Sequence, residues 1–277
     1  MAINLATKYG KQVAERFYQT SLTEGSFSKN MDAEFTGVKT VIVPSVDVVE
    51  MNDYKRSGSN RYGDPADLGD TKQEFTMTQD RSFTYVIDKG DNMEQNMIKQ
   101  AAKTISRQLR EVVTPEIDTY RFTKWAEAAG LKVNLTAALT EENILKTLIT
   151  AKVAMDKKKV PAKNRTLYIG AEAYEALLGC KQFLALEATG KETMLYGDVG
   201  RILGMKVSFV PEGYLPDGVA FMIVLRDAAI SPMKLHEYKI HKDPPGYSGH
   251  LCEGRFIYDA FVLDTKKDGI YVANAAG

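Results

Sequence analysis

The feature that most constrains the fold is a pair of strand-like segments separated by a long polar stretch. Residues 38–51 are rich in β-branched side chains, and apolar residues alternate with polar ones between positions 75 and 87. The intervening residues 52–70, NDYKRSGSNRYGDPADLGD, are nearly all turn formers and charges, which cannot form a core. The pattern predicts a long β-hairpin with a polar tip.

The length of this hairpin indicates where it lies. Its second strand, Gln73 to Asp88, would extend about 50 Å at about 3.3 Å per residue, whereas a compact chain of 277 residues has a radius of gyration of about 19 Å. A straight hairpin would therefore project beyond its own domain, and an isolated hairpin is marginal in water unless something covers it. We expect it to lie on another subunit. The alternative is that the strands bend and join an internal sheet.

A long helix is predicted after the hairpin. Its apolar residues keep the 3, 4 spacing of one buried stripe: Met97, Ile98, Ala101, Ala102, Ile105, Leu109, Val112 and Val113. Pro115 interrupts the stripe, and because proline lacks an N–H and clashes with the preceding turn, it should kink or break the helix. A continuation through Trp125 to Gly130 fits the pattern.

The middle of the chain alternates helix and strand. Thr140 begins a helix that ends before Pro161, with a predicted buried face of Ile144, Leu145, Leu148, Ile149 and Val153. Strands are predicted at 166–170, 205–210 and 218–230, and a short helix at 171–180. Such alternation is typical of a compact α/β unit. From His236 onward the pattern predicts strands, which would pack as a sheet on the long helix.

Composition excludes several classes of protein. The chain carries 36 Lys and Arg against 36 Asp and Glu, so no net field favours tight nucleic-acid binding. Cys180 and Cys252 fit no CxxC spacing and are expected to be buried thiols in a reduced compartment. The N-terminus is charged where a signal peptide needs an apolar stretch, and no apolar run is long enough for a membrane span. We expect neither secretion nor membrane insertion.

No catalytic or cofactor motif is found. His236, His241 and His250 lie in one stretch, but their spacing fits no standard zinc site, and His250 with Cys252 is only H-x-C. The glycine-rich stretch 197–204 lacks the Lys-Ser/Thr of a phosphate-binding loop. We therefore expect no enzyme activity, no metal and no cofactor.

The order of these elements resembles the major capsid proteins of tailed bacteriophages with the HK97-type fold, in particular those of phages and prophages of low-GC Gram-positive bacteria. The resemblance covers essentially the whole chain. It rests on MAINLATKYGKQVAERF, TGVKTVIV, TMTQDRSFTYVIDKGD, SRQLREVVTPEIDTYR and GDVGRILGMKVSFVP. It implies an α+β, HK97-like fold with an N-arm, an extended E-loop hairpin, a spine helix with a peripheral-domain sheet, and an axial α/β domain.

The resemblance also implies a division of the chain. Residues 1–35 would be the N-terminal arm, 36–92 the E-loop hairpin, 93–135 the peripheral domain with its spine helix, 136–235 the axial domain, and 236–277 the returning strands of the peripheral domain. In such shells each E-loop lies over a neighbouring subunit. The E-loop tip residues expected to contact that neighbour are Tyr54, Lys55, Arg56, Arg61 and Tyr62.

The implied function is assembly of hexamers and pentamers into an icosahedral head, built in the host cytoplasm, that encloses double-stranded DNA within the virion. The expected partners are other copies of the chain, a separate scaffolding protein, a portal protein, decoration proteins in some phages, and DNA held non-specifically. Maturation would bend the subunit at Gly90 and around Pro115. Relatives that cross-link their subunits suggest Lys55 or Lys72 as the amine, without an assignable partner.

Two alternatives compete with this interpretation. One is an encapsulin, a bacterial nanocompartment of the same fold that encloses a cargo enzyme. The other is a soluble α+β enzyme or binding protein, which would require the hairpin to fold inward and a pocket with convergent polar groups.

Overall fold

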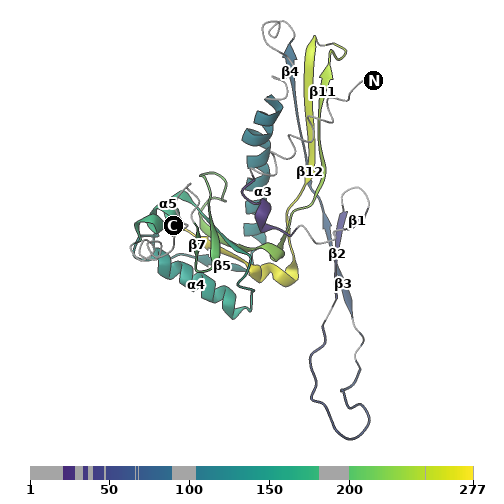
Figure 1. Ribbon diagram of the computed structural model, residues 1–277, viewed down its shortest axis with the longest axis vertical. Helices are drawn as coiled ribbons and strands as arrows, with labels where there is room; N and C mark the ends of the chain where they lie inside the picture. The colour runs from purple at the N-terminus through teal and green to yellow at the C-terminus, as the bar shows by residue number, and fades with distance from the viewer. Residues whose placement is uncertain are drawn as a thin grey trace. The chain divides into compact units, whose positions relative to one another are not determined.

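The computed structural model describes residues 21–28, 34–36, 40–46, 48–65, 67, 69–88, 104–180, 200–246 and 248–276 (Figure 1). The chain divides into two compact units. One comprises Met1–Lys29 and Gln79–Gly277, and the other comprises Asn30–Thr78. Each unit has its own sheets, so we describe them separately.

The smaller unit contains the predicted hairpin. Strand β2 (Thr40–Val46) pairs antiparallel with β3 (Asp70–Thr76), and β1 (Glu34–Thr36) adds to the other edge of β2. The β2–β3 register runs from Thr40 opposite Thr76 to Val46 opposite Asp70. The hairpin prediction is therefore confirmed for this part of the chain, and residues 47–69 form the connection between its two strands.

The second strand does not continue unbroken to Asp88, as the sequence analysis expected. It ends at Thr76, and a separate strand, β4 (Gln79–Asp88), belongs to the larger unit. β4 pairs along its whole length with β12 (Gly249–Tyr258), from Gln79 opposite Tyr258 to Asp88 opposite Gly249. The alternative, in which the strand joins an internal sheet, thus holds for this half. Alternation in sequence defines the two faces of a strand but not its pairing partner, so it could not reveal the break.

In the larger unit, the long helix packs against a three-stranded antiparallel sheet. Its order is β11 (Met233–Lys242), β12, β4. Alternate residues of β12 face the helix and form a buried cluster with it, in which Cys252 and Phe256 pack with Ile105 and Leu109. This cluster confirms the predicted stripe at Ile105, Leu109 and Val113, whereas Val112, also predicted on the stripe, is 46% exposed. The other end of the stripe, Met97 to Ala102, lies outside the described residues.

The helix passes through Pro115 without ending. Residues 104–128 are continuously helical: 104–108 are α-helical, η2 (Leu109–Val113) is π-helical, and α3 (Thr114–Ala128) is α-helical. At the junction the Thr114 N–H donates to the Leu109 carbonyl, and the Thr114 hydroxyl donates to the same oxygen at 2.9 Å. A wider turn moves the chain past the proline ring without breaking the helix. Of the kink or break expected at Pro115, the break does not occur, and the continuation toward Trp125 is confirmed.

A mixed six-stranded sheet forms the second part of the larger unit. Only the pairs β14–β5 and β6–β8 are parallel, and β10 and β13 form a separate two-stranded ladder. The sheet order is β5 (Leu131–Asn134), β14 (Ile270–Asn274), β9 (Val219–Leu225), β6 (Arg165–Ile169), β8 (Met205–Phe209), β7 (Arg201–Ile202). The remaining elements are η1 (Glu24–Ser26), α4 (Ile144–Lys157), α5 (Ala171–Gly179), η3 (Arg226–Ala228), β10 (Ala229–Ile230), β13 (Phe261–Val262) and η4 (Asp264–Gly269).

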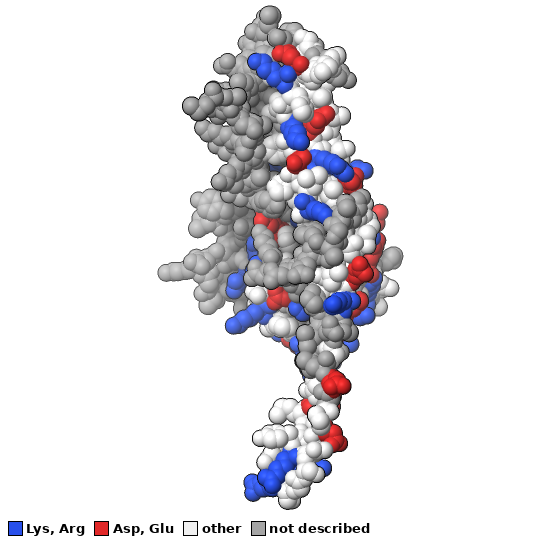
Figure 2. All heavy atoms as spheres, turned by 90° about the vertical axis from the view of Figure 1, so that its right-hand side faces the viewer, with Lys and Arg blue, Asp and Glu red and all other residues white. Residues whose placement is uncertain are grey.

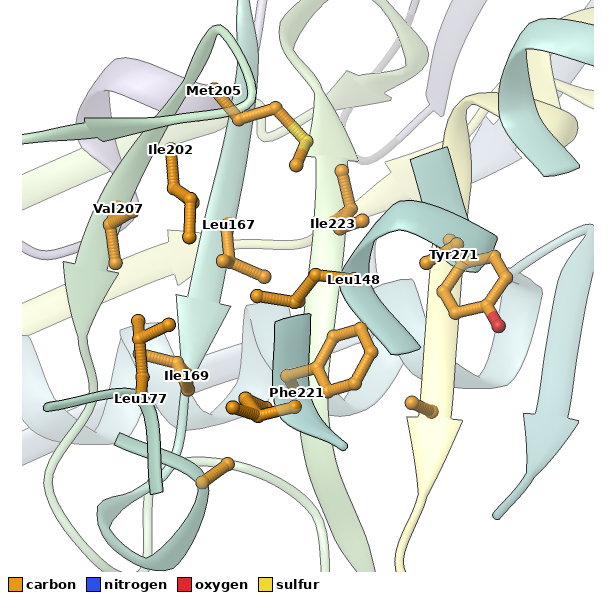
Figure 3. Packing of buried hydrophobic residues seen from close by; sticks show 14 of the residues in the cluster. Leu148, Leu167, Ile169, Leu177, Ile202, Met205, Val207, Phe221, Ile223 and Tyr271 are labelled. Carbon is orange, nitrogen blue, oxygen red and sulfur yellow. The ribbon is translucent and has the colours of Figure 1, made fainter. Parts of the chain in front are cut away.

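Helices cover both faces of this sheet. On one face α4 and α5 pack over alternate residues of the central strands, with Leu148 and Leu177 against Leu167 and Phe221 (Figure 3). On the other face α3 packs Phe122 and Trp125 over the intervening residues, among them Tyr168 and Met222. The strands predicted at 166–170 and 205–210 and the helix at 171–180 are confirmed as β6, β8 and α5. The strand predicted at 218–230 is confirmed only as far as Leu225, where β9 ends, and η3 then separates it from β10.

The predicted buried face of α4 needs correction. Ile149 and Val153 are each 42% exposed, because the buried stripe follows Ile144, Leu148, Ala151 and Met155 instead. At one edge of the six-stranded sheet, β14 pairs with β5 on one side and with β9 on the other.

Candidate functional site

The predicted contact residues lie in the loop 48–65, which has an ordered turn at its end. The Lys55 N–H donates to the Arg61 carbonyl at 2.9 Å, and the Gly63 N–H donates to the Asn60 carbonyl at 3.0 Å. The Asn60 amide also donates to Asp64 Oδ1 at 2.7 Å. Gly58, Asn60 and Gly63 all have positive φ, the region that glycine and asparagine tolerate best. These residues close a local turn that holds the tip together.

Aromatic and basic side chains project from this turn. The rings of Tyr54 and Tyr62 meet edge to face with centroids 5.1 Å apart, yet the two residues stay 54% and 84% exposed. Lys55, Arg56 and Arg61 are exposed, and Figure 2 shows Lys and Arg side chains gathered at the end of the loop. Interfaces are enriched in tyrosine and arginine, so the turn has the composition of a contact surface.

Sequence reasoning missed a second feature of this loop. Just before the turn, Val48 is 92% exposed, Val49 55% and Met51 100%. The sequence analysis assigned these three apolar residues to a strand, whereas β2 ends at Val46. Three apolar side chains left in water next to two exposed tyrosines extend the candidate surface toward the strands.

The two hinge candidates and the second cross-linking candidate do not belong to this turn. Gly90 lies outside the described residues, so the structure does not place this hinge candidate. Pro115 is the second residue of α3, directly after the π-helical segment. Lys72 is exposed in β3, on the strand rather than in the turn that carries Lys55.

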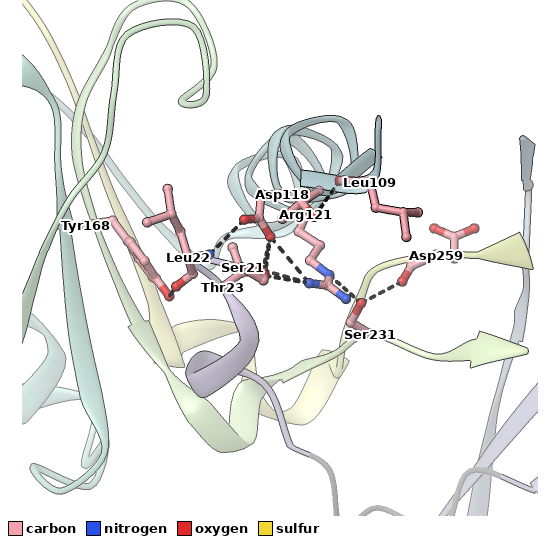
Figure 4. Close-up of polar contacts among 10 residues, drawn as sticks. Ser21, Leu22, Thr23, Leu109, Asp118, Arg121, Tyr168, Ser231 and Asp259 are labelled. Atoms are coloured by element: carbon pink, nitrogen blue, oxygen red, sulfur yellow. Dashed lines mark hydrogen bonds and ion pairs between the residues drawn. The ribbon is translucent and has the colours of Figure 1, made fainter. Parts of the chain in front are cut away.

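A buried polar cluster joins residues 21–23 to α3 (Figure 4). The Asp118 carboxylate accepts hydrogen bonds from the Ser21 hydroxyl at 2.6 Å, the Leu22 N–H at 2.8 Å and the Thr23 hydroxyl at 2.6 Å. The Arg121 guanidinium lies 3.4 Å from the same carboxylate and donates to the Thr23 hydroxyl at 2.8 Å. Each charge is thus paired and hydrogen-bonded, the condition under which buried charges are tolerated.

The cluster continues into the sheets on either side. Arg121 Nε donates to the Ser231 hydroxyl at 2.7 Å, and that hydroxyl donates to the Asp259 carbonyl at 3.1 Å. The Tyr168 hydroxyl donates to the Leu22 carbonyl at 3.2 Å, and burial raises the pKa of Tyr168. Sequence reasoning missed this cluster. A signal was available, because Asp118 and Arg121 share the 3, 4 spacing of a buried stripe with Trp125.

Within the described residues we find no catalytic constellation. A hollow of about 420 Å³ lies beside the start of α5, with walls that include Leu135, Val210 and Leu215 and the acidic residues Glu172, Glu212 and Asp217. No cluster of His, Cys, Asp and Glu there could hold a metal ion. No helix among the residues that the structure describes is long and apolar enough to cross a membrane. Cys180 and Cys252 are free and buried, as predicted.

The three histidines lie on two strands of the three-stranded sheet. His236 and His241 lie on β11, and His241 is 3.2 Å from Glu253 across the sheet. His250 is buried on β12. In the part of the chain that the structure describes, none of them belongs to a group of three or more His, Cys, Asp or Glu residues that could hold a metal ion.

Comparison with known proteins gives no match to a protein-family model and none to a curated sequence. Solved structures do match. The chain is similar to the capsid of cyanophage P-SCSP1u, with a TM-score of 0.69 and 14% identity over 88% of this chain and 85% of that one. It is also similar to a chain from Mycobacterium phage Che8, with a TM-score of 0.67 and 16% identity over 92% and 91%.

A third match comes from outside the phages. The virus-like particle of Pyrococcus furiosus aligns with a TM-score of 0.61 and 10% identity, over 98% of this chain and 100% of that one. At these identities the comparisons establish architecture. The chain therefore has the HK97-type fold of tailed-phage capsid chains, a fold that it also shares with this archaeal particle.

Proposed function

We propose that this chain is the major capsid protein of a tailed bacteriophage. Copies of it would self-assemble as hexamers and pentamers into an icosahedral head that encloses double-stranded DNA. The observation that carries the proposal is the agreement with the P-SCSP1u capsid chain over 88% of this chain and 85% of that one. Because nearly the whole of both chains is matched, the similarity extends beyond a single shared domain.

The exposed loop supports a role in assembly. Its turn presents Tyr54 and Tyr62 with three basic side chains, and Val48 and Met51 beside it are almost fully exposed. A surface of this kind is costly in a monomer and is typical of a protein contact. We infer that the residues Tyr54, Lys55, Arg56, Arg61 and Tyr62 contact a neighbouring subunit in the shell.

Charge balance fits a container for DNA. With 36 basic and 36 acidic residues, the chain has no net charge. Tight binding to DNA depends on many phosphate contacts and released counterions, so a neutral wall would hold a genome without fixing it in place. The proposal accordingly assigns the protein no enzyme activity and only non-specific contact with DNA, in the virion.

The resemblance to HK97-type capsid proteins also suggests a role for each range of the chain. We assign 1–35 to the N-terminal arm, 36–92 to the E-loop region, 93–135 and 236–277 to the peripheral domain, and 136–235 to the axial domain. β5 and β14 extend the axial sheet from both peripheral ranges. A separate scaffolding protein, a portal protein and, in some phages, decoration proteins would complete the head. The host of the phage would be a low-GC Gram-positive bacterium.

Maturation of the shell would require the subunit to bend. We propose Gly90 and the helix around Pro115 as the flexing points, and the π-helical turn directly before Pro115 supports the second of these. Replacing Gly90 with alanine should leave subunits folded but lower the yield of shells. Covalent cross-linking through Lys55 or Lys72 would be a separate property, detectable as subunit ladders in denaturing gels.

An encapsulin-type shell is the second candidate. The observation that favours it is the full-length match to the Pyrococcus furiosus virus-like particle, over 98% and 100% of the two chains. In that case the shell would enclose a cargo enzyme instead of a genome. The two candidates predict the same assembly and different contents.

The test is negative-stain electron microscopy with size-exclusion chromatography on purified protein, with and without a co-expressed scaffolding candidate. Hollow icosahedral shells, or pentamers and hexamers that convert to shells, would support both shell functions. Mass spectrometry and nuclease treatment of the contents would then separate DNA from a cargo enzyme. A compact monomer under all conditions would refute the proposal.

A further inference from the structure

Residues 21–28 form a strap that is hydrogen-bonded to three elements of the larger unit. Its first residues bind the buried carboxylate of α3 described above. Further along, the Ser26 hydroxyl donates to the Thr166 hydroxyl at 3.0 Å, and the Ser28 N–H donates to the Ala229 carbonyl at 3.0 Å. The strap therefore joins α3, β6 and β10, which are far apart in sequence.

The strap is a packed part of the protein and not a surface loop. Thr23 and Ser26 are buried, and Phe27 is only 7% exposed. The Phe27 ring belongs to the buried cluster that contains Phe122 of α3, and the Arg121 guanidinium lies 4.7 Å from the centroid of this ring. A cation over an aromatic face is held more strongly in a buried setting than at the surface. Because moving the strap would unpair several buried groups at once, the strap should be either fully bound or released.

The strap meets the long helix at the point where the helix changes its packing partner. From Ile105 to Ile117 the buried residues of the helix pack on the three-stranded sheet. From Phe122 onward they pack on the six-stranded sheet. Asp118 and Arg121, which bind the strap, lie between these two sets. The strap is thus fixed at the boundary between the two sheets.

The same boundary carries the two strands that connect the sheets. β10 leads through Ser231 into β11, and β12 leads through Asp259 into β13. β10 and β13 pack in the buried cluster of the six-stranded sheet, so the chain crosses between the sheets twice here. Arg121 donates to the Ser231 hydroxyl at 2.7 Å, which donates to the Asp259 carbonyl at 3.1 Å (Figure 4). Since the same guanidinium donates to the Thr23 hydroxyl at 2.8 Å, one side chain joins the helix, the strap and both crossings.

We propose that residues 21–28 act as a strap that sets the angle between the three-stranded and the six-stranded sheet. In the bound state, Arg121 holds the helix, the strap and both crossing strands in one arrangement. When the strap is released, the three-stranded sheet and the helix before Asp118 turn as one body about this boundary. The smaller unit begins at Asn30, just after Ser28, so a force on that unit acts on the strap first. The inference goes beyond the proposed function, because it concerns the shape of a single subunit.

Two threonine variants separate the strap from the helix that it binds. Thr23→Val removes the hydroxyl that is hydrogen-bonded to Asp118 and Arg121, and it leaves a side chain of similar shape. Thr123→Val is the matched control, because the Thr123 hydroxyl donates to the Thr119 carbonyl within α3, at 2.9 Å. Each variant removes one threonine hydroxyl, and only the first of these hydroxyls belongs to the strap.

The first measurement is amide hydrogen exchange followed by mass spectrometry. In Thr23→Val we expect exchange to become about tenfold faster or more in the strap and in the crossings 229–233 and 257–261. Peptides from the centres of β6 and β9 should exchange at the rate of the parent, which distinguishes release of the strap from general unfolding. Thr123→Val should match the parent in all of these peptides.

The second measurement is the distance between spin labels on the two sheets, by double electron–electron resonance. The labels are attached at Val86→Cys on β4 and Val153→Cys on α4, positions that are 41% and 42% exposed. The native Cys180 and Cys252 are buried and should not be labelled. An excess of unlabelled chain keeps the labels of different copies apart, whether or not the chain forms shells. We expect one distance population in the parent and the control, and a second, shifted population in the strap variant.

Both results together would support the strap. Faster exchange in residues 21–28 with an unchanged distance distribution would overturn it, because the segment would then be attached without setting the angle. Identical exchange in the two threonine variants would also overturn it. If Thr23→Val does not fold, Ser21→Ala, which removes one of the three hydrogen bonds to Asp118, takes its place with the same outcomes. Absence of shells from the parent chain would refute the proposed function and leave the strap unaffected.

Discussion

Arg121 and Asp118 form an ion pair inside the protein, one turn apart on α3. Their closest atoms are 3.4 Å apart, and their side chains are 4% and 1% exposed. The carboxylate also accepts three hydrogen bonds from residues 21–23. The pair therefore attaches residues 21–23 to the long helix.

Replacing Asp118 with asparagine should destabilise the protein strongly. The change leaves the Arg121 guanidinium buried without its counter-charge, a loss of about 3–5 kcal/mol in the free energy of unfolding. Urea unfolding followed by circular dichroism measures it. The matched control is Glu127→Gln in the exposed pair with Lys124, also three residues apart on α3, which should cost less than about 0.5 kcal/mol. Similar losses in the two variants would contradict this interpretation.

Stability should fall in alkaline solution because of Tyr168. Burial raises the pKa of its hydroxyl above the unfolded value of about 10. The folded state then holds a proton that the unfolded state releases, so the stabilisation is complete below about pH 10 and is lost as the pH rises further. Unfolding free energies measured from pH 8 upward test this.

The Tyr168→Phe variant is the control for that effect. It removes the titrating group together with the hydrogen bond to the Leu22 carbonyl, so it should be less stable near neutral pH by about 1 kcal/mol. Its stability should decline less steeply with pH than that of the parent. Parallel curves for the two proteins would assign the alkaline loss to other groups.

Gly254 is required by the packing of Phe83 in the three-stranded sheet. A Cβ at this position would overlap the Phe83 ring, which lies across the glycine on the neighbouring strand. We expect Gly254→Ala to cost about 1–3 kcal/mol, the usual range for overpacking. Gly25→Ala is the control, because its Cβ would meet no atom within 4 Å. Thermal unfolding of the two variants should show a lower Tm for Gly254→Ala only.

The tip should affect assembly and not folding. Tyr62→Ala removes a residue that is 84% exposed and makes a ring contact with Tyr54, so the unfolding free energy should change by less than about 0.5 kcal/mol. Shell yield, measured by size-exclusion chromatography, should drop about tenfold or more. Ile149→Ala, at a partly exposed position of α4, should leave the yield unchanged. Normal shells from Tyr62→Ala would show that the tip is dispensable.

Local patterns in the sequence predicted the individual elements well. The helix and strands of the middle segment, the hairpin β2–β3 and the stripe at Ile105 and Leu109 follow from hydrophobic periodicity, which records the faces that an element buries. The polar tip was equally predictable, since glycine, asparagine and charged residues cannot form a core. These features depend on neighbours a few residues away, and for that reason a single sequence contains them.

Tertiary structure decided the rest. Whether Gln79–Asp88 continues the hairpin or pairs with Gly249–Tyr258 depends on contacts between segments far apart in sequence, and alternation is the same in both cases. The buried pair of Asp118 and Arg121 is stable only because Thr23 and Ser231 reach it from other parts of the chain. The sequence by itself determined the elements and their buried faces, and the folded chain determined which of them meet, because pairing and burial are properties of distant segments brought together.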